Sequence, residues 1–145
     1  MQPASRDIAT ENKIAVSPRV CLADLFTVRV KHGCDGDAVS QMIETGQYIW
    51  VFNLARPGGS VRKLRFLLDE VTNPQSVRGL DLDAVLNRIL PAARASFPPG
   101  EICLRFLISR PTWMRLRHEL KLGLGNAPRK PLVEYLRSRW IGDGK

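Results

Sequence analysis

The spacing of apolar and polar positions divides this chain of 145 residues into segments with different expected structures. Residues 1–17 are largely polar and show neither a helical nor a strand period, so we expect a mobile N-terminal arm. From Pro18 onward, the stretch PRVCLADLF predicts a short helix, and GDAVSQMIETG predicts a second one. The second helix carries apolar residues at helical spacing and should end at Gly46.

Two apolar stretches that follow this helix predict a β-hairpin. QYIWVFNL and VRKLRFLL are rich in β-branched and aromatic residues, and ARPGGS between them supplies proline and glycine for a turn. Residues 18–71 should therefore form a unit of helices and a wing-like hairpin. The next stretch, TNPQSVRG, has no apolar period and holds asparagine, proline and glycine, so residues 72–79 are the expected linker to a second unit over residues 80–145.

The second unit contains the pattern of a helix-turn-helix. LDLDAVLNRILPAARASF places apolar residues on one helical stripe, which Pro91 should end or kink. After PPG, Glu101 to Phe106 predict a short helix, LIS a tight turn, and Arg110 to Leu122 a second helix. Ser109 is the expected N-cap of this second helix, and a proline in its first turn is compatible with that start.

Two short helices that pack across a sharp turn need small and apolar residues at defined positions, and this segment has them. The residues that fit this packing are Ile102, Cys103, Phe106, Ile108, Trp113 and Leu116. Leu107 departs from the pattern, because a glycine commonly eases the backbone at that position. On the second helix, Trp113 and Leu116 should point to one side, whereas Arg115 and His118 should point to the other. A helix that is buried on one face and positive on the other suits insertion into the major groove of DNA.

Net charge changes this picture because it is unevenly distributed. The chain has a net charge of +8 and an isoelectric point near 10.0, which would attract nucleic acid or an anionic membrane surface. Residues 1–72 contribute +1 and residues 73–145 contribute +7, so the second half should carry the binding surface. The chain has no apolar run of about eighteen residues to span a bilayer, and its charged N-terminus is unlike a signal peptide. We expect a cytoplasmic protein without a membrane partner, and its three unclustered cysteines suit a reducing compartment.

The segment EICLRFLISRPTWMRLRHELKLG, followed by NAPRKPLVEYLRSRWIG, resembles the excisionase-like winged helix-turn-helix domains, which are relatives of the mercury-resistance-type regulators. The likeness covers residues 100–141. In that family a recognition helix that opens with S-R-x-T is followed by a glycine, a short basic wing and a helix of the LxxYLxxR kind. The corresponding positions here are Ser109, Arg110, Thr112, Gly123, Arg129, Lys130 and residues 132–139.

A fainter second copy of the same pattern occupies residues 18–71 when Gly46 is aligned with Gly123. SQMIETG resembles the end of the recognition helix with its glycine, and YIWVFNLARPGGSVRKLRF resembles a long basic wing. The resemblance therefore implies an α+β, α-rich protein with a winged helix-turn-helix fold, in one unit or in two tandem units.

The function that follows from these features is binding of double-stranded DNA, as a transcription regulator or an excisionase-like accessory factor. We expect the helix from Arg110 to Leu122 to read the major groove, with Arg110, Arg115 and His118 at base edges. The residues expected on the DNA backbone are Ser109, Thr112, Arg117, Lys121, Arg129 and Lys130, joined by Arg62, Lys63 and Arg65 of the hairpin. No cofactor or metal ion is expected. A second copy of the chain or another DNA-bound protein is left open as a partner.

A different interpretation is a protein-interaction or dimerisation module, in which Met114 and Trp140 mark the partner surface and the basic face is only solvated. Trp113 and Phe106 could also stack on the bases of single-stranded nucleic acid, although aromatic residues at this spacing usually form a core.

Catalytic motifs are missing from the sequence, so we do not expect an enzyme. One cluster near the first predicted turn offers metal-ligand atoms without a second cluster to complete a site. Its members are His32, Cys34, Asp35 and Asp37. An acidic set for phosphodiester cleavage could be built from Asp81, Asp83 and Glu101, but carboxylates beside helix starts are ordinarily caps or solvated charges.

Overall fold

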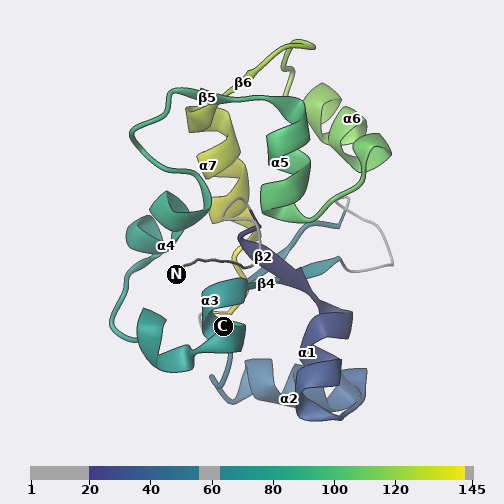
Figure 1. Cartoon of the computed structure of the whole chain (residues 1–145). Coiled ribbons are helices and arrows are strands. Elements are labelled where there is room, and N and C mark those ends of the chain that lie inside the picture. The colour runs from purple at the N-terminus through teal and green to yellow at the C-terminus, as the bar shows by residue number, and fades with distance from the viewer. Residues whose placement is uncertain (1–19, 56–62, 143–145) are drawn as a thin grey trace, which may run out of the picture.

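The computed structural model describes residues 20–55 and 63–142, and their fold is α+β and rich in helices (Figure 1). Within these ranges, seven α-helices accompany a three-stranded and a two-stranded antiparallel sheet. The predicted N-terminal arm, the hairpin turn and Arg62 lie outside the described residues. None of the described helices is both long and apolar enough to cross a membrane.

The three-stranded sheet joins β2 (Leu22–Asp24), β4 (Leu64–Leu67) and β3 (Val51–Asn53), in that order. Antiparallel pairing of β3 with β4 confirms the two strands of the predicted hairpin. The helix predicted over PRVCLADLF is wrong in its first part, because Leu22 to Asp24 pair with β4 and the helix begins only at Leu25. Asp24 ends the strand and caps the helix, since its carboxylate accepts a hydrogen bond from the Thr27 amide.

Alternate side chains of this sheet face two different layers. On one side, Ala23, Val51 and Phe66 pack with helices α1 (Leu25–His32) and α2 (Gly36–Glu44). On the other side, Leu22 and Phe52 pack against the helices of the second half. Figure 1 accordingly shows α1 and α2 on one side of the sheet and α5, α6 and α7 on the other. The sheet thus holds the two halves of the chain together.

The rest of the chain forms short elements in a compact order. These are α3 (Leu68–Thr72), the 3₁₀ helix η2 (Pro74–Val77), α4 (Leu82–Ile89), β5 (Ser96–Phe97), α5 (Pro99–Phe106), α6 (Arg110–Glu119), β6 (Ala127–Pro128) and α7 (Arg129–Arg139). The predicted helix before Pro91 and both helices of the predicted helix-turn-helix are present. Helix α6 is shorter than predicted, because Lys121 adopts a left-handed backbone with φ 59°.

The main core draws on both halves of the chain. Its largest members are Leu22, Trp50, Phe52, Leu54 and Leu67 from the first half, and Ile89, Leu90, Phe97, Ile102, Phe106, Trp113, Leu132 and Leu136 from the second. The segment expected as a linker, residues 72–79, also contributes a buried side chain, that of Val77. Helices α5 and α6 are therefore supported by the sheet of the first half as well as by α4 and α7.

The C-terminal segment after α7 returns to the sheet. The indole N–H of Trp140 donates to the Ile49 carbonyl at 2.7 Å, and its ring stacks on Trp50 with centroids 5.2 Å apart. The amide of Ile141 donates to the Val51 carbonyl at 2.9 Å. At Gly142, a Cβ atom would lie 2.0 Å from the Ile49 carbonyl oxygen, so only glycine fits there.

Two helix pairs in the chain share the same backbone geometry. Helices α1 and α5 each have eight residues and end at a left-handed residue, Gly33 with φ 61° and Leu107 with φ 55°. Two residues later, Asp35 and Ser109 cap the second helices through side-chain hydrogen bonds. The pair α1–α2 in the first half is therefore built like the predicted helix-turn-helix α5–α6.

The two pairs also end alike. The C-cap residue of α2, Thr45, has φ −87° and ψ 0°, and the C-cap residue of α6, Leu120, has φ −85° and ψ 0°. Positive-φ residues follow them directly, Gly46 with φ 82° and Lys121 with φ 59°. Gly46 thus corresponds in structure to Lys121 and not to Gly123, with which sequence comparison aligned it.

Candidate nucleic-acid interface

The turn between α5 and α6 is held by an arginine from the sheet. Leu107 has φ 55° and ψ 54°, which is a left-handed conformation. Glycine adopts this conformation most easily, and the sequence pattern predicts a glycine at this position. Arg65 of β4 donates from Nε to the Phe106 carbonyl at 3.2 Å and from Nη2 to the Leu107 carbonyl at 2.8 Å. Burial lowers the pKa of Arg65, and the Asp24 carboxylate opposes this effect. The structure thus places Arg65, a predicted DNA contact, at the C-terminus of α5, where the helix dipole favours a cation.

The start of α6 gathers three of the predicted site residues. The hydroxyl of Ser109 accepts a hydrogen bond from the Thr112 amide at 3.3 Å and donates to the Thr112 hydroxyl at 2.9 Å. That hydroxyl also accepts from the Lys63 ammonium at 3.2 Å. Ser109 is therefore the N-cap that the sequence predicted, and β4 brings a lysine of the first half to the start of α6.

Helix α6 has one buried and one exposed face, as predicted. Trp113 and Leu116 are 1% and 3% exposed and pack against α5 and the sheet. The opposite face carries the exposed residues Arg110, Met114 and His118, and the exposed Lys121 follows directly after the C-cap of the helix. We call these four residues the exposed row. Within the described part of the chain, the side chains of the three polar members of this row make no hydrogen bond or ion pair. Their charged and polar groups are directed to solvent and remain available to a ligand.

The other predicted contacts on α6 are engaged within the protein. Arg115, predicted at a base edge, is half-buried and forms an ion pair with Glu119 at 3.4 Å. Arg117 donates from Nη1 to the Leu122 carbonyl at 2.9 Å, and its buried Nε has no partner among the described residues. These two arginines therefore lie beside the exposed row and not in it.

Arg129 and Lys130 lie at the start of α7. Arg129 donates from Nε to the Leu90 carbonyl at 2.7 Å. Lys130 is exposed and has no hydrogen-bond or ion-pair partner within residues 20–55 and 63–142. The strand pair expected of a wing after α6 is not formed by residues 122–126, and β6 pairs instead with β5, where Phe97 lies opposite Ala127. The sequence LGLGNAPRK lacks the β-branched residues that would favour a hairpin.

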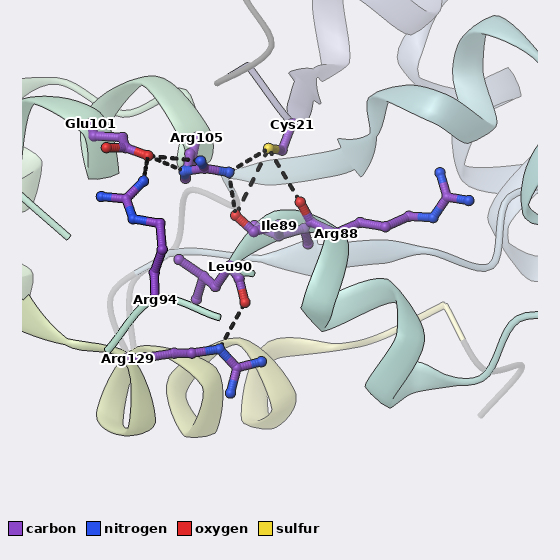
Figure 2. A network of polar contacts seen from close by, with 8 residues as sticks. All are labelled: Cys21, Arg88, Ile89, Leu90, Arg94, Glu101, Arg105 and Arg129. Atoms are coloured by element: carbon purple, nitrogen blue, oxygen red, sulfur yellow. Dashed lines mark hydrogen bonds and ion pairs between the residues drawn. The ribbon is translucent and has the colours of Figure 1, made fainter. Parts of the chain in front are cut away.

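A buried ion cluster fixes α5 against its neighbours (Figure 2). Glu101 is 8% exposed and binds Arg94 and Arg105, the latter at 2.7 Å. The hydrogen bond from Arg94, together with those from Arg105, lowers the pKa of Glu101 to about 2. Arg105 also donates to the Ile89 carbonyl at 3.0 Å and to the Cys21 sulfur at 3.5 Å.

This cluster was not foreseen from the sequence. Glu101 and Arg105 stand four residues apart, which is the spacing of a helical ion pair, and that was the only local signal. Its burial depends on α4 and on the segment before β2, which lie far away in the chain. The cluster ties α5 to the end of α4 and so positions the pair α5–α6.

The residues weighed for metal binding and catalysis have other roles. The described residues contain no group of three or more His, Cys, Asp or Glu that could hold a metal ion. His32 contacts the Tyr48 hydroxyl at 2.6 Å, and Asp35 caps α2. Among the acidic residues considered for a nuclease, Asp81 caps α4, and Asp83 pairs with Arg137. Among the described residues, these side chains do not come together in a cluster that could bind a metal ion.

Comparison of the chain with protein-family models, with curated protein sequences and with solved structures finds no match. The function therefore has to be inferred from the geometry of the described residues.

Proposed function

We propose that this protein binds double-stranded DNA by placing α6 in the major groove, as a transcription regulator or an excisionase-like accessory factor. The observation that carries this proposal is the exposed row on α6, in which Arg110, His118 and Lys121 have no partner within the described residues. Arginine and lysine side chains directed to solvent from one helix face can reach phosphates and base edges in a groove.

The surroundings of α6 support the same proposal. Its first turn contains no acidic residue, and its N-cap Ser109 is neutral, so no negative charge of the helix itself compensates the positive end of the dipole. In helix-turn-helix proteins the N-terminal residues of the second helix contact base edges, which assigns that role to Arg110. Arg65 donates to the Leu107 carbonyl in the turn before α6, and Lys63 donates to the Thr112 hydroxyl in its first turn, so the start of α6 would enter a groove as a rigid element.

We further propose that the hairpin β3–β4 serves as the wing of α6, since Lys63 lies at the start of that helix. The first helix pair does not read DNA in this proposal, although it has the same backbone geometry. Its second helix, α2, exposes Asp37 and Glu44, which would be repelled by phosphates. The chain would then contain two units of one architecture, of which only the second binds DNA.

The test uses the intact chain and duplex DNA, with binding measured by fluorescence anisotropy at several salt concentrations. Wild type should bind non-specific duplex in the micromolar range or weaker, with log affinity falling linearly as log salt rises. The double variant Arg110→Gln and Lys121→Gln should weaken binding and lower the magnitude of the salt slope by about 0.9, because Lys121 is the proposed phosphate contact of the two and each lost phosphate contact removes about 0.9.

The matched control is Arg78→Gln, which removes an exposed cation between η2 and α4 that has no side-chain partner in the described part of the chain. It should leave the slope nearly unchanged. An affinity that does not depend on salt, or an equal loss in the control and in the α6 variant, would contradict the proposal.

A second function is favoured by the exposed apolar side chains of α1, where Phe26 and Val30 are 68% and 63% exposed. They stand four residues apart and hence on one helix face, which would suit contact with a second copy of the chain. Trp140, expected on such a surface, is instead half-buried and donates to the Ile49 carbonyl. Sedimentation velocity of wild type and Phe26→Gln tests this function, which requires a dimer that the substitution dissociates. A monomer at all concentrations would rule it out.

A further inference from the structure

A hollow of about 550 Å³ lies beside the first turns of α7, on the flank that faces the loop between α4 and β5. Its charged lining residues are Arg94, Arg129, Lys130, Arg137 and Glu134. Four cations thus surround the hollow with a single carboxylate among them. Arg94 and Arg137 are paired with Glu101 and Asp83, whereas Arg129 and Lys130 have no carboxylate partner among the described residues. Two uncompensated cations beside two paired arginines still favour occupation of the hollow by an anion.

The cations keep donors that the protein does not use. Arg94 contacts Glu101 through Nη1, and Arg129 contacts the Leu90 carbonyl through Nε (Figure 2). The two Nη groups of Arg129 make no hydrogen bond within the described residues. The Lys130 ammonium, which is exposed, is likewise without a partner in the described ranges. Several N–H groups can therefore turn toward one bound anion.

The start of α7 is itself left without negative charge. This helix of 11 residues has no side-chain N-cap and no acidic residue in its first turn. By contrast α1, α2 and α4 are each capped by an aspartate. Arg129 and Lys130 occupy the first two helical positions, where cations oppose the helix dipole. An anion in the hollow would compensate both the dipole and the two cations.

We propose that this hollow binds a phosphate group. Guanidinium and ammonium donors around a helix N-terminus match the charge and the tetrahedral oxygens of a phosphate. The phosphate would belong either to the backbone of a bound duplex or to a small phosphorylated molecule. The proposal does not rest on α6 binding DNA, because the residues of the hollow lie on α7 and on the loop before β5.

The first experiment titrates the intact chain with inorganic phosphate and follows backbone amides by NMR, at constant ionic strength set by sodium chloride. Amides of Lys130, Val133 and Glu134 should shift with a saturable, millimolar dissociation constant. Lys130→Gln and Arg137→Gln should each weaken binding about threefold, as removal of an exposed charge pair does. Glu134→Gln should strengthen it by a similar factor, because it removes the carboxylate from the lining.

Arg78→Gln again provides the matched control, with the same charge change outside the hollow, and should leave the phosphate titration unchanged. Shifts that do not saturate, or an equal weakening by Arg78→Gln and Lys130→Gln, would overturn the proposal. Thermal melts of the variants check folding, which Lys130→Gln should not affect because this side chain is exposed and unpaired among described residues.

A second experiment identifies the source of the phosphate. If the site holds the DNA backbone, Lys130→Gln should also reduce the magnitude of the salt slope for duplex binding by about 0.9. If it holds a small phosphorylated molecule, the slope should stay as in wild type while the phosphate titration is weakened. The α6 double variant should leave the phosphate titration intact in both cases, which separates a failure of this proposal from a failure of DNA binding through α6.

Discussion

Leu107 occupies a backbone conformation that glycine adopts at much lower cost. Its φ of 55° brings Cβ close to the following carbonyl oxygen, and the residue is 37% exposed, so its side chain is partly buried. We predict that Leu107→Gly leaves the free energy of unfolding nearly unchanged, because relief of a strain of about 1–2 kcal/mol offsets the added entropy of the unfolded chain and the lost burial of the side chain. Urea denaturation of both proteins measures the difference.

Leu124→Gly is the control for this prediction. Leu124 is 73% exposed and is not among the described residues with positive φ. Glycine there should lower the free energy of unfolding by up to about 1 kcal/mol. If Leu107→Gly destabilised the protein as much as Leu124→Gly, the left-handed turn would not be a source of strain.

Glu101 should make stability depend on pH in a defined range. Its pKa in the folded protein is lowered to about 2 from an ordinary value of 4.5, through Arg94 and then Arg105. A lowered acid pKa contributes stability that is complete above the unfolded value and is lost as pH falls toward the folded one. We predict that Glu101→Gln costs on the order of 3 kcal/mol at pH 7, and that this difference shrinks between pH 4.5 and pH 2.

Urea denaturation of wild type and Glu101→Gln at several pH values provides the measurement. Asp83→Asn is a suitable comparison, because its ion pair with Arg137 is exposed on both sides. An exposed pair contributes about 0–1 kcal/mol, so this variant should show little pH-dependent difference from wild type. A constant difference for Glu101→Gln across the acid range would contradict the assigned cause.

At the level of elements, the N-cap of α6 allows folding and binding to be separated. Ser109→Ala removes the hydrogen bond to the Thr112 amide and should cost about 1 kcal/mol of stability. Ser109→Asp keeps an N-cap acceptor and should retain stability within about 0.5 kcal/mol. It also adds a negative charge next to Arg110, so we predict that it weakens duplex binding while the melting temperature is kept. Equal DNA binding by Ser109→Asp and wild type would argue against contact at this end of α6.

The two faces of α6 predict opposite outcomes in thermal melts. Trp113 is 1% exposed, and Trp113→Ala should destabilise the protein by about 3–5 kcal/mol through cavity formation. Met114 is 40% exposed, and Met114→Ala should change stability by less than about 1 kcal/mol. If the effects were reversed, the helix would be rotated relative to the structure.

Elements defined by local signals could be predicted from the sequence. Helices α2, α4 and α5 and the Ser109 cap follow from apolar spacing and from capping residues within one or two turns. The exposure of Met114 and His118 follows from the same helical period, whereas Arg115, expected on the same side, is half-buried and paired with Glu119. Even the left-handed residue at position 107 was indicated, because the pattern of the turn asks for glycine.

Contacts between distant segments could not be predicted in this way. Strand β2 has only three residues, too few for an alternation of apolar and polar side chains to be recognised. It is stabilised by pairing with β4, which lies more than forty residues later in the chain. Arg65 looks like a solvent-facing cation of a hairpin, but the strand directs it to carbonyls of the α5–α6 turn. The ion cluster around Glu101 depends on Arg94 and on the end of α4 in the same way.

At the level of the whole molecule, the shared core should make folding cooperative. Phe52 is fully buried between the sheet and the second-half helices. We predict that the intact chain unfolds in a single calorimetric transition, and that Phe52→Ala lowers its stability by about 3–5 kcal/mol. Amide hydrogen exchange should then become faster in α6 as well as in α1. Two separate transitions, or faster exchange confined to α1, would show that the halves fold independently.

The segment that follows α7 has a consequence for synthesis of the chain. Strand β3 stands at the edge of the three-stranded sheet, and Trp140 and Ile141 bind along its open side. An uncovered strand edge offers unpaired amides and carbonyls to any other extended chain. During translation the residues that cover this edge emerge after every strand of the sheet. The nascent protein therefore carries an aggregation-prone edge until residues 140–142 leave the ribosome, and a chaperone that binds extended, apolar segments would protect it during that interval.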